Sequence, residues 1–311
     1  MSFHTDNVAI LLATYNGEKY IAEQLDSIIE QSCNDWELYI HDDGSHDLTC
    51  DIINKYATNY PNQIHIIDAA PRGSAKSNFL FLMSEVDAPY YMFCDQDDVW
   101  KYDKLEVSLS ALKSLESANG SSMPLLVFSD STVVDSDLNT IHNSFLSYQR
   151  LDPRRLRFSE LIVHNVVPGN TVTFNHSLLE YALKYSDEDA IIMHDTWCAL
   201  VATYFGKIAF VRQSTLLYRQ HDSNALGAIR SSGPKFVLSM IRNINVLKSS
   251  ILATRRQSGE FARAFELGST SLPARYASIG TKNKLQRLSF YKKNHIRRSG
   301  LYRSIGFYLL G

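Results

Sequence analysis

The sequence predicts an α/β fold, a mostly parallel sheet with helices packed against it. From residue 8 to residue 129, short apolar segments of strand length alternate with longer segments whose apolar residues recur every three or four positions. The first short segment, residues 8–14, is apolar almost throughout, as expected for a strand covered on both faces. Strands that alternate with helices in this way are typical of parallel sheets with helices on both faces.

Each element in this part of the chain follows from its apolar pattern and from the polar turns beside it. The turn Asn16-Gly17 ends the first strand, and Ile21, Leu25 and Ile28 then recur at helical spacing. The same reasoning places further strands at 36–40, 64–67, 90–94 and 125–129, and helices over 48–56, 78–86 and 101–115.

Beyond residue 129 the alternation is less regular. Residues 130–168 are expected to form short strands, turns and a basic loop. A turn at 168–170 precedes a predicted strand at 171–174, and residues 194–205 are predicted to form a helix that has Asp195 near its start. Two further strands are expected at 208–211 and 215–219.

The charge is divided unevenly along the chain, although the formal net charge is only −2. Residues 1–228 contain 15 Lys and Arg against 31 Asp and Glu, whereas residues 229–311 contain 16 against 2. The second part has amphipathic helical stretches that begin at Lys235 and Lys284. We therefore expect an α/β domain over 1–228 and a basic amphipathic helical region over 229–311. The charge of that region suits binding to an anionic membrane surface, and the alternative is that the region packs on the domain with its charges exposed. Binding to nucleic acid is not expected, because no nucleic-acid-binding motif accompanies the charge.

Several classes of protein are excluded or disfavoured. No run of 18 apolar residues is present, so no transmembrane helix is expected. The N-terminus has no basic segment before its first apolar stretch, which disfavours a secretory signal. The four cysteines have no CxxC spacing and are expected to be reduced, as in a cytoplasmic protein.

Polar clusters follow three of the predicted strands, at residues 14–16, 42–45 and 95–98. In open α/β sheets, ligands bind outside the carboxyl ends of the strands. The three clusters together therefore predict a ligand site at that edge of the sheet. Each cluster has a simpler explanation by itself, because polar residues are also typical of loops and of helix N-termini.

The segment Asp95-Gln96-Asp97-Asp98 contains three carboxylates in four residues. Carboxylates so close together repel one another, and a divalent cation relieves that repulsion. Mg²⁺ or Mn²⁺ held by one or two carboxylates and by substrate phosphates is a common arrangement. An acidic turn at the start of the next helix is the alternative explanation.

Three further side chains have both a functional and a structural interpretation. Tyr15 could stack on a base, and Asp42 could accept a hydrogen bond from a base or a ribose hydroxyl, but both could simply form loops. Asp195 could act as a general base or cap a helix. His221 follows a predicted strand and could bind a metal ion, although a solitary histidine is more often structural.

With these residues in place, the sequence resembles the family 2 glycosyltransferases of the GT-A fold over about residues 7–228. Within that family it is similar to the bacterial rhamnosyltransferases that build cell-wall or capsular polysaccharides. The motifs that carry the resemblance are Leu12-Ala13-Thr14-Tyr15-Asn16-Gly17, Asp42-Asp43-Gly44-Ser45, Phe93-Cys94-Asp95-Gln96-Asp97-Asp98-Val99-Trp100, His194-Asp195 and Tyr218-Arg219-Gln220-His221-Asp222.

The resemblance implies a role for each matching residue. Asp195 would be the catalytic base, and Asp97 would bind Mn²⁺ or Mg²⁺ together with His221. Asp95 would contact the ribose, or the metal indirectly, and Asp42 would bind the base. The other implied donor-binding residues are Thr14, Tyr15, Asn16, Lys76, Asn78 and Gln96.

The resemblance also implies the reaction. A sugar, with L-rhamnose from dTDP-β-L-rhamnose favoured, would move with inversion to a hydroxyl of a lipid-linked saccharide. The enzyme would then lie on the inner face of the cell membrane as a peripheral protein. The alternatives are a family 2 transferase for another donor such as a UDP-sugar, or a silent nucleotide-sugar-binding scaffold. A nucleotide-diphosphate hydrolase or a nucleotidyltransferase would need a glycine-rich phosphate loop or a different basic signature, and the sequence shows neither.

Overall fold

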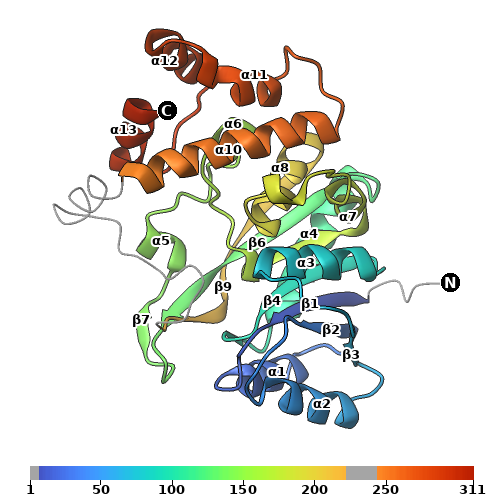
Figure 1. Ribbon diagram of the computed structural model, residues 1–311. Coiled ribbons are helices and arrows are strands. Elements are labelled where there is room, and N and C mark those ends of the chain that lie inside the picture. The colour runs from blue at the N-terminus through green and yellow to red at the C-terminus, as the bar shows by residue number, and fades with distance from the viewer. Residues whose placement is uncertain (1–6, 222–243) are drawn as a thin grey trace.

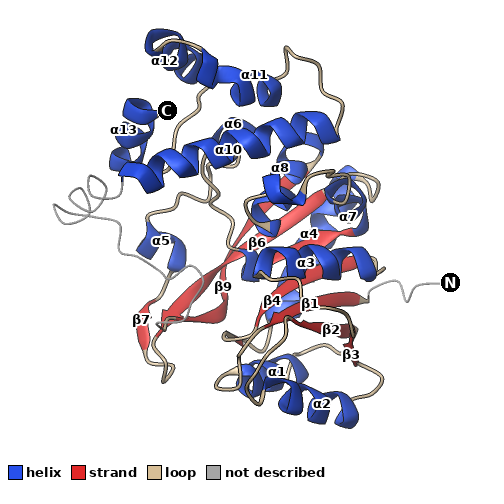
Figure 2. Ribbon diagram, in the orientation of Figure 1, coloured by secondary structure: helices blue, strands red, loops and turns tan. Residues whose placement is uncertain are grey.

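One sheet runs through the computed structural model, which describes residues 7–221 and 244–311, and helices cover both faces of the sheet (Figure 2). Its order within the described residues is β3-β2-β1-β4-β8-β6-β9-β5, with β7 paired to β6. The strands are β1 (Val8–Thr14), β2 (Trp36–Asp42), β3 (Ile64–Ile66), β4 (Tyr90–Asp95), β5 (Val99–Trp100), β6 (Leu125–Val134), β7 (Thr140–His142), β8 (Val172–Asn175) and β9 (Lys207–Arg219).

The sheet confirms the α/β prediction and adds antiparallel strands to it. β1 pairs in parallel with β2 and β4, and β2 pairs in parallel with β3, so their carboxyl ends meet at one edge. β8 runs antiparallel to its neighbours β4 and β6. The two strands expected at 208–211 and 215–219 are one strand, β9, because the exposed pair Arg212 and Gln213 bulges out of its pairing with β6.

Helices α1 to α4 alternate with strands as predicted, and α8 lies where a helix was predicted, whereas α5, α6 and α7 were not predicted. More helices follow beyond residue 243 (Figure 1). The bounds are α1 (Ile21–Ile29), α2 (Thr49–Asn59), α3 (Ala75–Glu85), α4 (Lys104–Asn119), α5 (Phe145–Gln149), α6 (Phe158–Leu161), η1 (Gly169–Thr171), α7 (His176–Ala182), η2 (Glu188–Ala190), α8 (His194–Phe205), α10 (Ile244–Ala264), α11 (Leu272–Ser278), η3 (Ile279–Thr281), α12 (Lys284–Lys293) and α13 (Leu301–Leu310).

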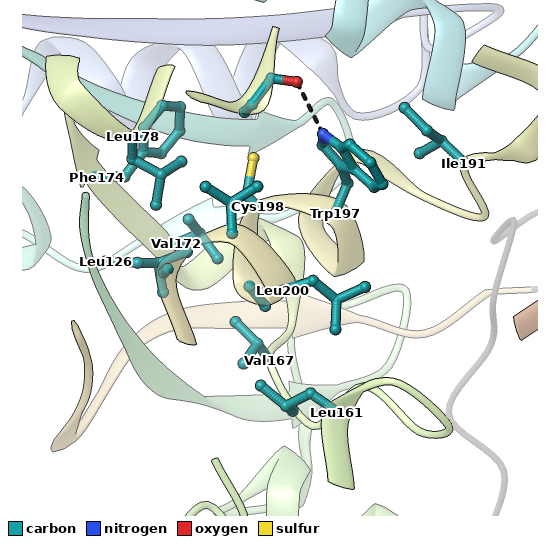
Figure 3. Close-up of a cluster of buried hydrophobic side chains, with 14 of the residues drawn as sticks. Leu126, Leu161, Val167, Val172, Phe174, Leu178, Ile191, Trp197, Cys198 and Leu200 are labelled. Carbon is teal, nitrogen blue, oxygen red and sulfur yellow. Dashed lines mark hydrogen bonds between the residues drawn. The ribbon is translucent and has the colours of Figure 1, made fainter. Parts of the chain in front are cut away.

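The sheet separates two hydrophobic cores. Val8, Ile10 and Leu12 of β1 belong to the core beneath α1, α2 and α4, whereas the intervening Ala9 and Leu11 belong to the other core. This alternation explains why β1 is apolar almost throughout. The second core gathers side chains of β6, β8 and α8, with Trp197 donating to the Ala182 carbonyl at 2.8 Å (Figure 3).

The C-terminal helices continue this second core. Phe261 of α10 is fully buried and its ring lies 5.4 Å from that of Trp197 in α8. Tyr276, Tyr291 and Phe307, from α11, α12 and α13, are equally buried. Within the described residues, therefore, the basic helices are packed onto the α/β fold, with α10 lying across it beneath α11 and α12 (Figure 1).

Two details of this region differ from the prediction. The amphipathic stretch from Lys284 is two helices, α12 and α13, because the chain turns at Gly300, which adopts a φ of +84°. α11 was not predicted, although the Ser271 cap and the Pro273 beside it are typical of a helix start. The predicted boundary at 228 and 229 and the helix start at Lys235 lie outside the described residues. No helix among the described residues is long and apolar enough to cross a bilayer.

Candidate active site

A cavity of about 790 Å³ opens at the carboxyl ends of β1 and β4. All three polar clusters contribute to it, as predicted from their places after the strands. Part of its lining consists of predicted donor-side residues, and another part consists of residues 165–170 and 192–196. The predicted site residues that line the cavity are Thr14, Tyr15, Asn78, Asp95, Gln96, Asp97 and Asp195.

Tyr15 and Gln96 join the ends of β1 and β4. The Tyr15 N–H donates to Gln96 Oε1 at 2.9 Å, and Gln96 Nε2 donates back to the Tyr15 carbonyl at 2.9 Å. The Tyr15 side chain is 52 % exposed at the cavity. Gln96 therefore fixes the backbone beneath an accessible aromatic ring, which suits a stacking surface.

Asp43, and not Asp42, faces the cavity. Asp42 accepts hydrogen bonds from the Thr14 hydroxyl at 2.8 Å and from the Ser45 N–H at 2.7 Å. Burial opposes ionisation of Asp42, but these hydrogen bonds outweigh it and lower its pKa. Asn16 lies outside the cavity and accepts a hydrogen bond from the His46 N–H at 2.9 Å. Asp42 and Asn16 thus shape the loops, and no sequence pattern distinguishes Asp43 from its neighbour.

The two predicted donor residues of α3 occupy different places. Asn78 lines the cavity and is held by the buried His41, whose Nδ1 lies 2.9 Å from Asn78 Oδ1. Lys76 lies outside the cavity lining, and its Nζ donates to the Glu188 carbonyl at 2.9 Å. Lys76 therefore connects α3 to η2 in this structure.

The acidic cluster after β4 is largely withdrawn from water. Burial, with the nearby charges of Asp97 and Asp195, raises the pKa of Asp95 to about 7. Burial also raises the pKa of Asp97, against the opposing effect of His221. Asp98 is fully buried and accepts hydrogen bonds from Asn170 Nδ2 and the Arg219 N–H. Negative charge is thus costly here, and a cation would offset that cost.

Asp97 and His221 present their polar atoms to each other, with Oδ2 and Nε2 2.9 Å apart. Among residues 7–221 and 244–311, no three His, Cys, Asp or Glu side chains are grouped to hold a metal ion. One carboxylate and one imidazole fit a divalent cation whose remaining ligands come from phosphate oxygens. This pair is therefore compatible with the predicted metal site, although it is not a complete ligand set.

Asp195 lies in the first turn of α8 and does not cap it, because the N-cap is Met193. Its carboxylate accepts from the Thr196 N–H at 2.5 Å and from Asn165 Nδ2 at 3.2 Å. Burial raises the pKa of Asp195 to about 6. A carboxylate with a pKa near neutral is suited to accept a proton in a reaction. Asn165 was missed by sequence reasoning because it lies in an irregular loop.

Arg219 is a second residue that sequence reasoning missed, although it lies inside a quoted motif. It is 1 % exposed and donates to the Asp97 carbonyl at 3.0 Å and to the Ser136 carbonyl at 2.6 Å. Its other terminal nitrogen pairs with Glu23 of α1. Arg219 thereby ties β9 to the chain beside Asp97, which no local pattern indicates.

Three comparisons place this fold among known proteins. Residues 9–172 match the model for Glycosyl transferase family 2. The dTDP-rhamnosyl transferase RfbG of Shigella flexneri is 31 % identical over 75 % of this chain and 79 % of its own. The structure of Staphylococcus aureus TarS 1–349 in complex with UDP covers 93 % of this chain and 80 % of its own, with a TM-score of 0.52 and 15 % identity. The mannosyltransferase PcManGT from Pyrobaculum calidifontis, in complex with GDP-Man and Mn²⁺, covers 92 % of this chain and 75 % of its own, with a TM-score of 0.50 and 17 % identity.

A curled, mostly parallel sheet flanked by helices, with a cavity at the carboxyl ends of its strands, is the GT-A architecture of nucleotide-sugar-dependent transferases. The chain belongs to glycosyltransferase family 2. Glycosyl transfer is accordingly the class of activity that the family membership supports.

Proposed function

We propose that this protein is an inverting, metal-dependent rhamnosyltransferase. It would move L-rhamnose from dTDP-β-L-rhamnose to a hydroxyl of a lipid-linked saccharide during synthesis of a bacterial surface polysaccharide. The observation that supports this most is the single cavity shared by Tyr15, Asp97 and Asp195. The choice of rhamnose rests on the similarity to the Shigella flexneri dTDP-rhamnosyl transferase.

The donor would lie along the wall formed by the ends of β1 and β4. In this proposal the base stacks on Tyr15, whose backbone Gln96 holds, and Asp43 accepts a hydrogen bond from the base or ribose. Asp97 and His221 would hold Mn²⁺ or Mg²⁺ against the diphosphate. The bound cation would offset the charge that develops on the leaving diphosphate.

Asp195 would act as the general base. Its carboxylate accepts the proton of the acceptor hydroxyl while that oxygen attacks the anomeric carbon from the face opposite the diphosphate. The new carbon–oxygen bond forms as the bond to the diphosphate breaks, so a β-linked donor gives an α-linked product. Asn165 and Thr196 keep the Asp195 carboxylate in place through their hydrogen bonds.

A donor screen tests this assignment. Thermal unfolding is followed with dTDP-β-L-rhamnose, UDP-glucose, UDP-N-acetylglucosamine and GDP-mannose, each with and without Mn²⁺. We expect dTDP-β-L-rhamnose with Mn²⁺ to raise the Tm most, because the proposed donor should have the lowest Kd. A ligand at about 100 times its Kd stabilises the folded protein by about 2.7 kcal/mol. A larger shift with a UDP-sugar would replace the donor assignment. Donor binding without release of the free nucleotide, in the presence of a lipid-linked saccharide, would favour the silent scaffold.

The acceptor side of the proposal includes attachment to an anionic membrane, as a cytoplasmic protein on the inner face. Residues 244–311 contain 13 Lys and Arg against Glu260 and Glu266. On α12 the side chain of Leu285 is 79 % exposed, and exposed lysines surround it in the sequence. Each cation near an anionic leaflet contributes about 1 kcal/mol, and an exposed leucine can enter the interface. The exposed lysines are Lys282, Lys284, Lys292 and Lys293.

Charge reversal on α12 tests the membrane proposal better than truncation, because removing α10 would expose Phe261 and its core neighbours. Sedimentation with phosphatidylglycerol vesicles is compared for the wild type, K284E/K292E and the control K55E/K207E, which changes the charge equally on α2 and β9. We expect the α12 variant to lose binding and the control to keep at least part of it. Equal loss in both variants, or none, contradicts an α12 docking face.

A further inference from the structure

The segment that leads into the proposed catalytic base is fixed from outside the α/β fold. It runs from Ser186 through η2 to Met193 and continues directly into α8, where Asp195 lies in the first turn. Ile192 and Met193 form part of the cavity wall, next to Asp195. The position of this segment therefore sets where the carboxylate of Asp195 points.

Two buried side chains of α10 hold the segment at both of its ends. Glu260 Oε1 accepts hydrogen bonds from the Ser186 N–H at 2.6 Å and from the Asp187 N–H at 3.1 Å. Gln257 Oε1 accepts from the Ile192 N–H at 2.8 Å. Glu260 and Gln257 are each 1 % exposed, so water cannot replace them without an opening of the structure.

Charge strengthens the Glu260 end of this contact. Burial by itself would raise the pKa of Glu260, but its hydrogen bonds from Ser186, Arg263 and Asp187 lower it, so the carboxylate is ionised. Arg256 of α10 adds an ion pair to Asp187 at 3.2 Å. Hydrogen bonds that involve a charged partner are stronger than neutral ones.

The other side of the segment faces α3. Lys76 Nζ donates to the Glu188 carbonyl at 2.9 Å, and Ala75 and Asn78 of α3 line the same cavity. The segment is thus held between α3, which carries the predicted donor residue Asn78, and α10 of the basic C-terminal region. A displacement of about 1 Å in a catalytic group can cost about 10²-fold in rate.

We propose that α10 is a positioning element of the active site, in which Gln257 and Glu260 fix segment 186–193 and thereby the reach of Asp195 toward the acceptor hydroxyl. Gln257 and Glu260 are positioning residues and touch neither substrate nor the reacting atoms. This inference rests on the proposed function for its catalytic consequence, but the structural restraint itself does not. It also gives Gln257 and Glu260 of the C-terminal region a role in positioning the active site, besides the proposed membrane contact of α12.

The test uses the full chain and two independent readouts. Gln257→Met and Glu260→Met each remove the side-chain oxygen that accepts hydrogen bonds from the segment. Glu260→Gln keeps an accepting oxygen but removes the charge, and Ser258→Ala is the matched control. Ser258 is as buried as its neighbours on α10, but its hydroxyl donates to the Pro273 carbonyl at 2.8 Å and not to the segment. The readouts are hydrogen–deuterium exchange of the amides of 186–193 and steady-state kcat and KM for the donor.

We expect faster exchange within 186–193 and a kcat lower by about 10- to 100-fold in both methionine variants, with the KM of the donor within about threefold of wild type. Glu260→Gln should recover most of the kcat, and Ser258→Ala should leave the kcat and the exchange of this segment unchanged. Faster exchange with an unchanged kcat, or an equal loss of kcat in Ser258→Ala, overturns the inference. A wild type that turns over no nucleotide sugar would refute the proposed function instead, and exchange would still decide whether α10 holds the segment.

Discussion

Replacing Asp195 with asparagine should inactivate the enzyme and stabilise it at the same time. Burial raises the pKa of this carboxyl from 3.8 to about 6. Keeping it ionised at pH 7 therefore costs the folded protein about 3 kcal/mol, at about 1.36 kcal/mol for each pKa unit. The asparagine amide has almost the same shape and carries no charge, so it avoids that cost.

The gain is partly offset by a lost hydrogen bond. Asp195 accepts from Thr196 with one oxygen and from Asn165 with the other, and an amide has only one oxygen to accept with. That loss costs about 0.5–1.5 kcal/mol, which leaves a net stabilisation of about 1.5–2.5 kcal/mol. The Tm should rise by roughly 2–5 °C at pH 7. The loss of the base should lower kcat by about 10²- to 10⁴-fold while donor binding persists.

The pH dependence of the free energy of unfolding shows whether ionised Asp195 stabilises or destabilises the folded protein. Between about pH 4 and pH 6 the folded wild type retains a proton on Asp195 that the unfolded chain has released, so this group makes the free energy of unfolding fall as pH rises. The ionisable Asp95 interacts with Asp195, but its own pKa is raised to about 7, so Asp95 is also largely protonated in this range. The adjacent His194 stays neutral, because burial lowers its pKa to about 3. The wild-type kcat should also decline below about pH 6, where Asp195 becomes protonated.

Thermal unfolding from pH 5 to pH 8, calorimetric donor binding and release of the free nucleotide measure these effects together. The stability difference between Asp195→Asn and wild type should grow with pH and level off near neutrality. A variant that keeps transfer within tenfold of wild type removes Asp195 from the base role. A variant whose Tm at pH 7 is below that of the wild type contradicts the charge-burial argument.

Three more substitutions examine other parts of the structure. Asp97→Asn should weaken Mn²⁺-dependent donor binding at least about tenfold by calorimetry and leave metal-free binding unchanged, since it replaces the carboxylate proposed to bind the cation. Gly17→Ala should raise the donor KM severalfold, because the new Cβ would collide with the Gln96 side chain that holds Tyr15, and an unchanged KM would contradict this. Phe261→Ala should lower the free energy of unfolding, measured by denaturant titration, by about 3–5 kcal/mol, because Phe261 of α10 is buried in the core that α10 shares with α8. Unfolding should remain a single transition, and two separate transitions would argue against a shared core.

Local sequence patterns determined the first half of the fold. Apolar segments with strand and helix periodicities predicted β1 to β4 and α1 to α4 within a few residues of their observed bounds. The place of the polar clusters after the strands was likewise sufficient to predict one shared cavity, because parallel strands bring their carboxyl ends to one edge. Asp97 and Tyr15 were found in this way, whereas Asp195 was singled out by its place at the start of a predicted helix and by the family resemblance.

Neighbouring residues within a motif could not be separated by pattern. Asp42 and Asp43 are chemically identical, yet the first folds back on Thr14 and Ser45 while the second lines the cavity. Lys76 is likewise a predicted donor residue, and in the structure its amine contacts the carbonyl of Glu188. The direction of a loop side chain depends on contacts that sequence spacing does not encode.

The sequence by itself thus determined the alternating elements, the edge of the sheet that carries the site, and the basic character of the C-terminal part. The tertiary structure decided what holds the site together: Arg219 behind Asp97, Asn165 beside Asp195, and Gln257 and Glu260 on the segment before α8. The physical reason is the range of the interactions. Periodicity reflects which face of a local element is buried, whereas these hydrogen bonds join residues 30 to 122 positions apart, and such partners meet only when the chain has folded.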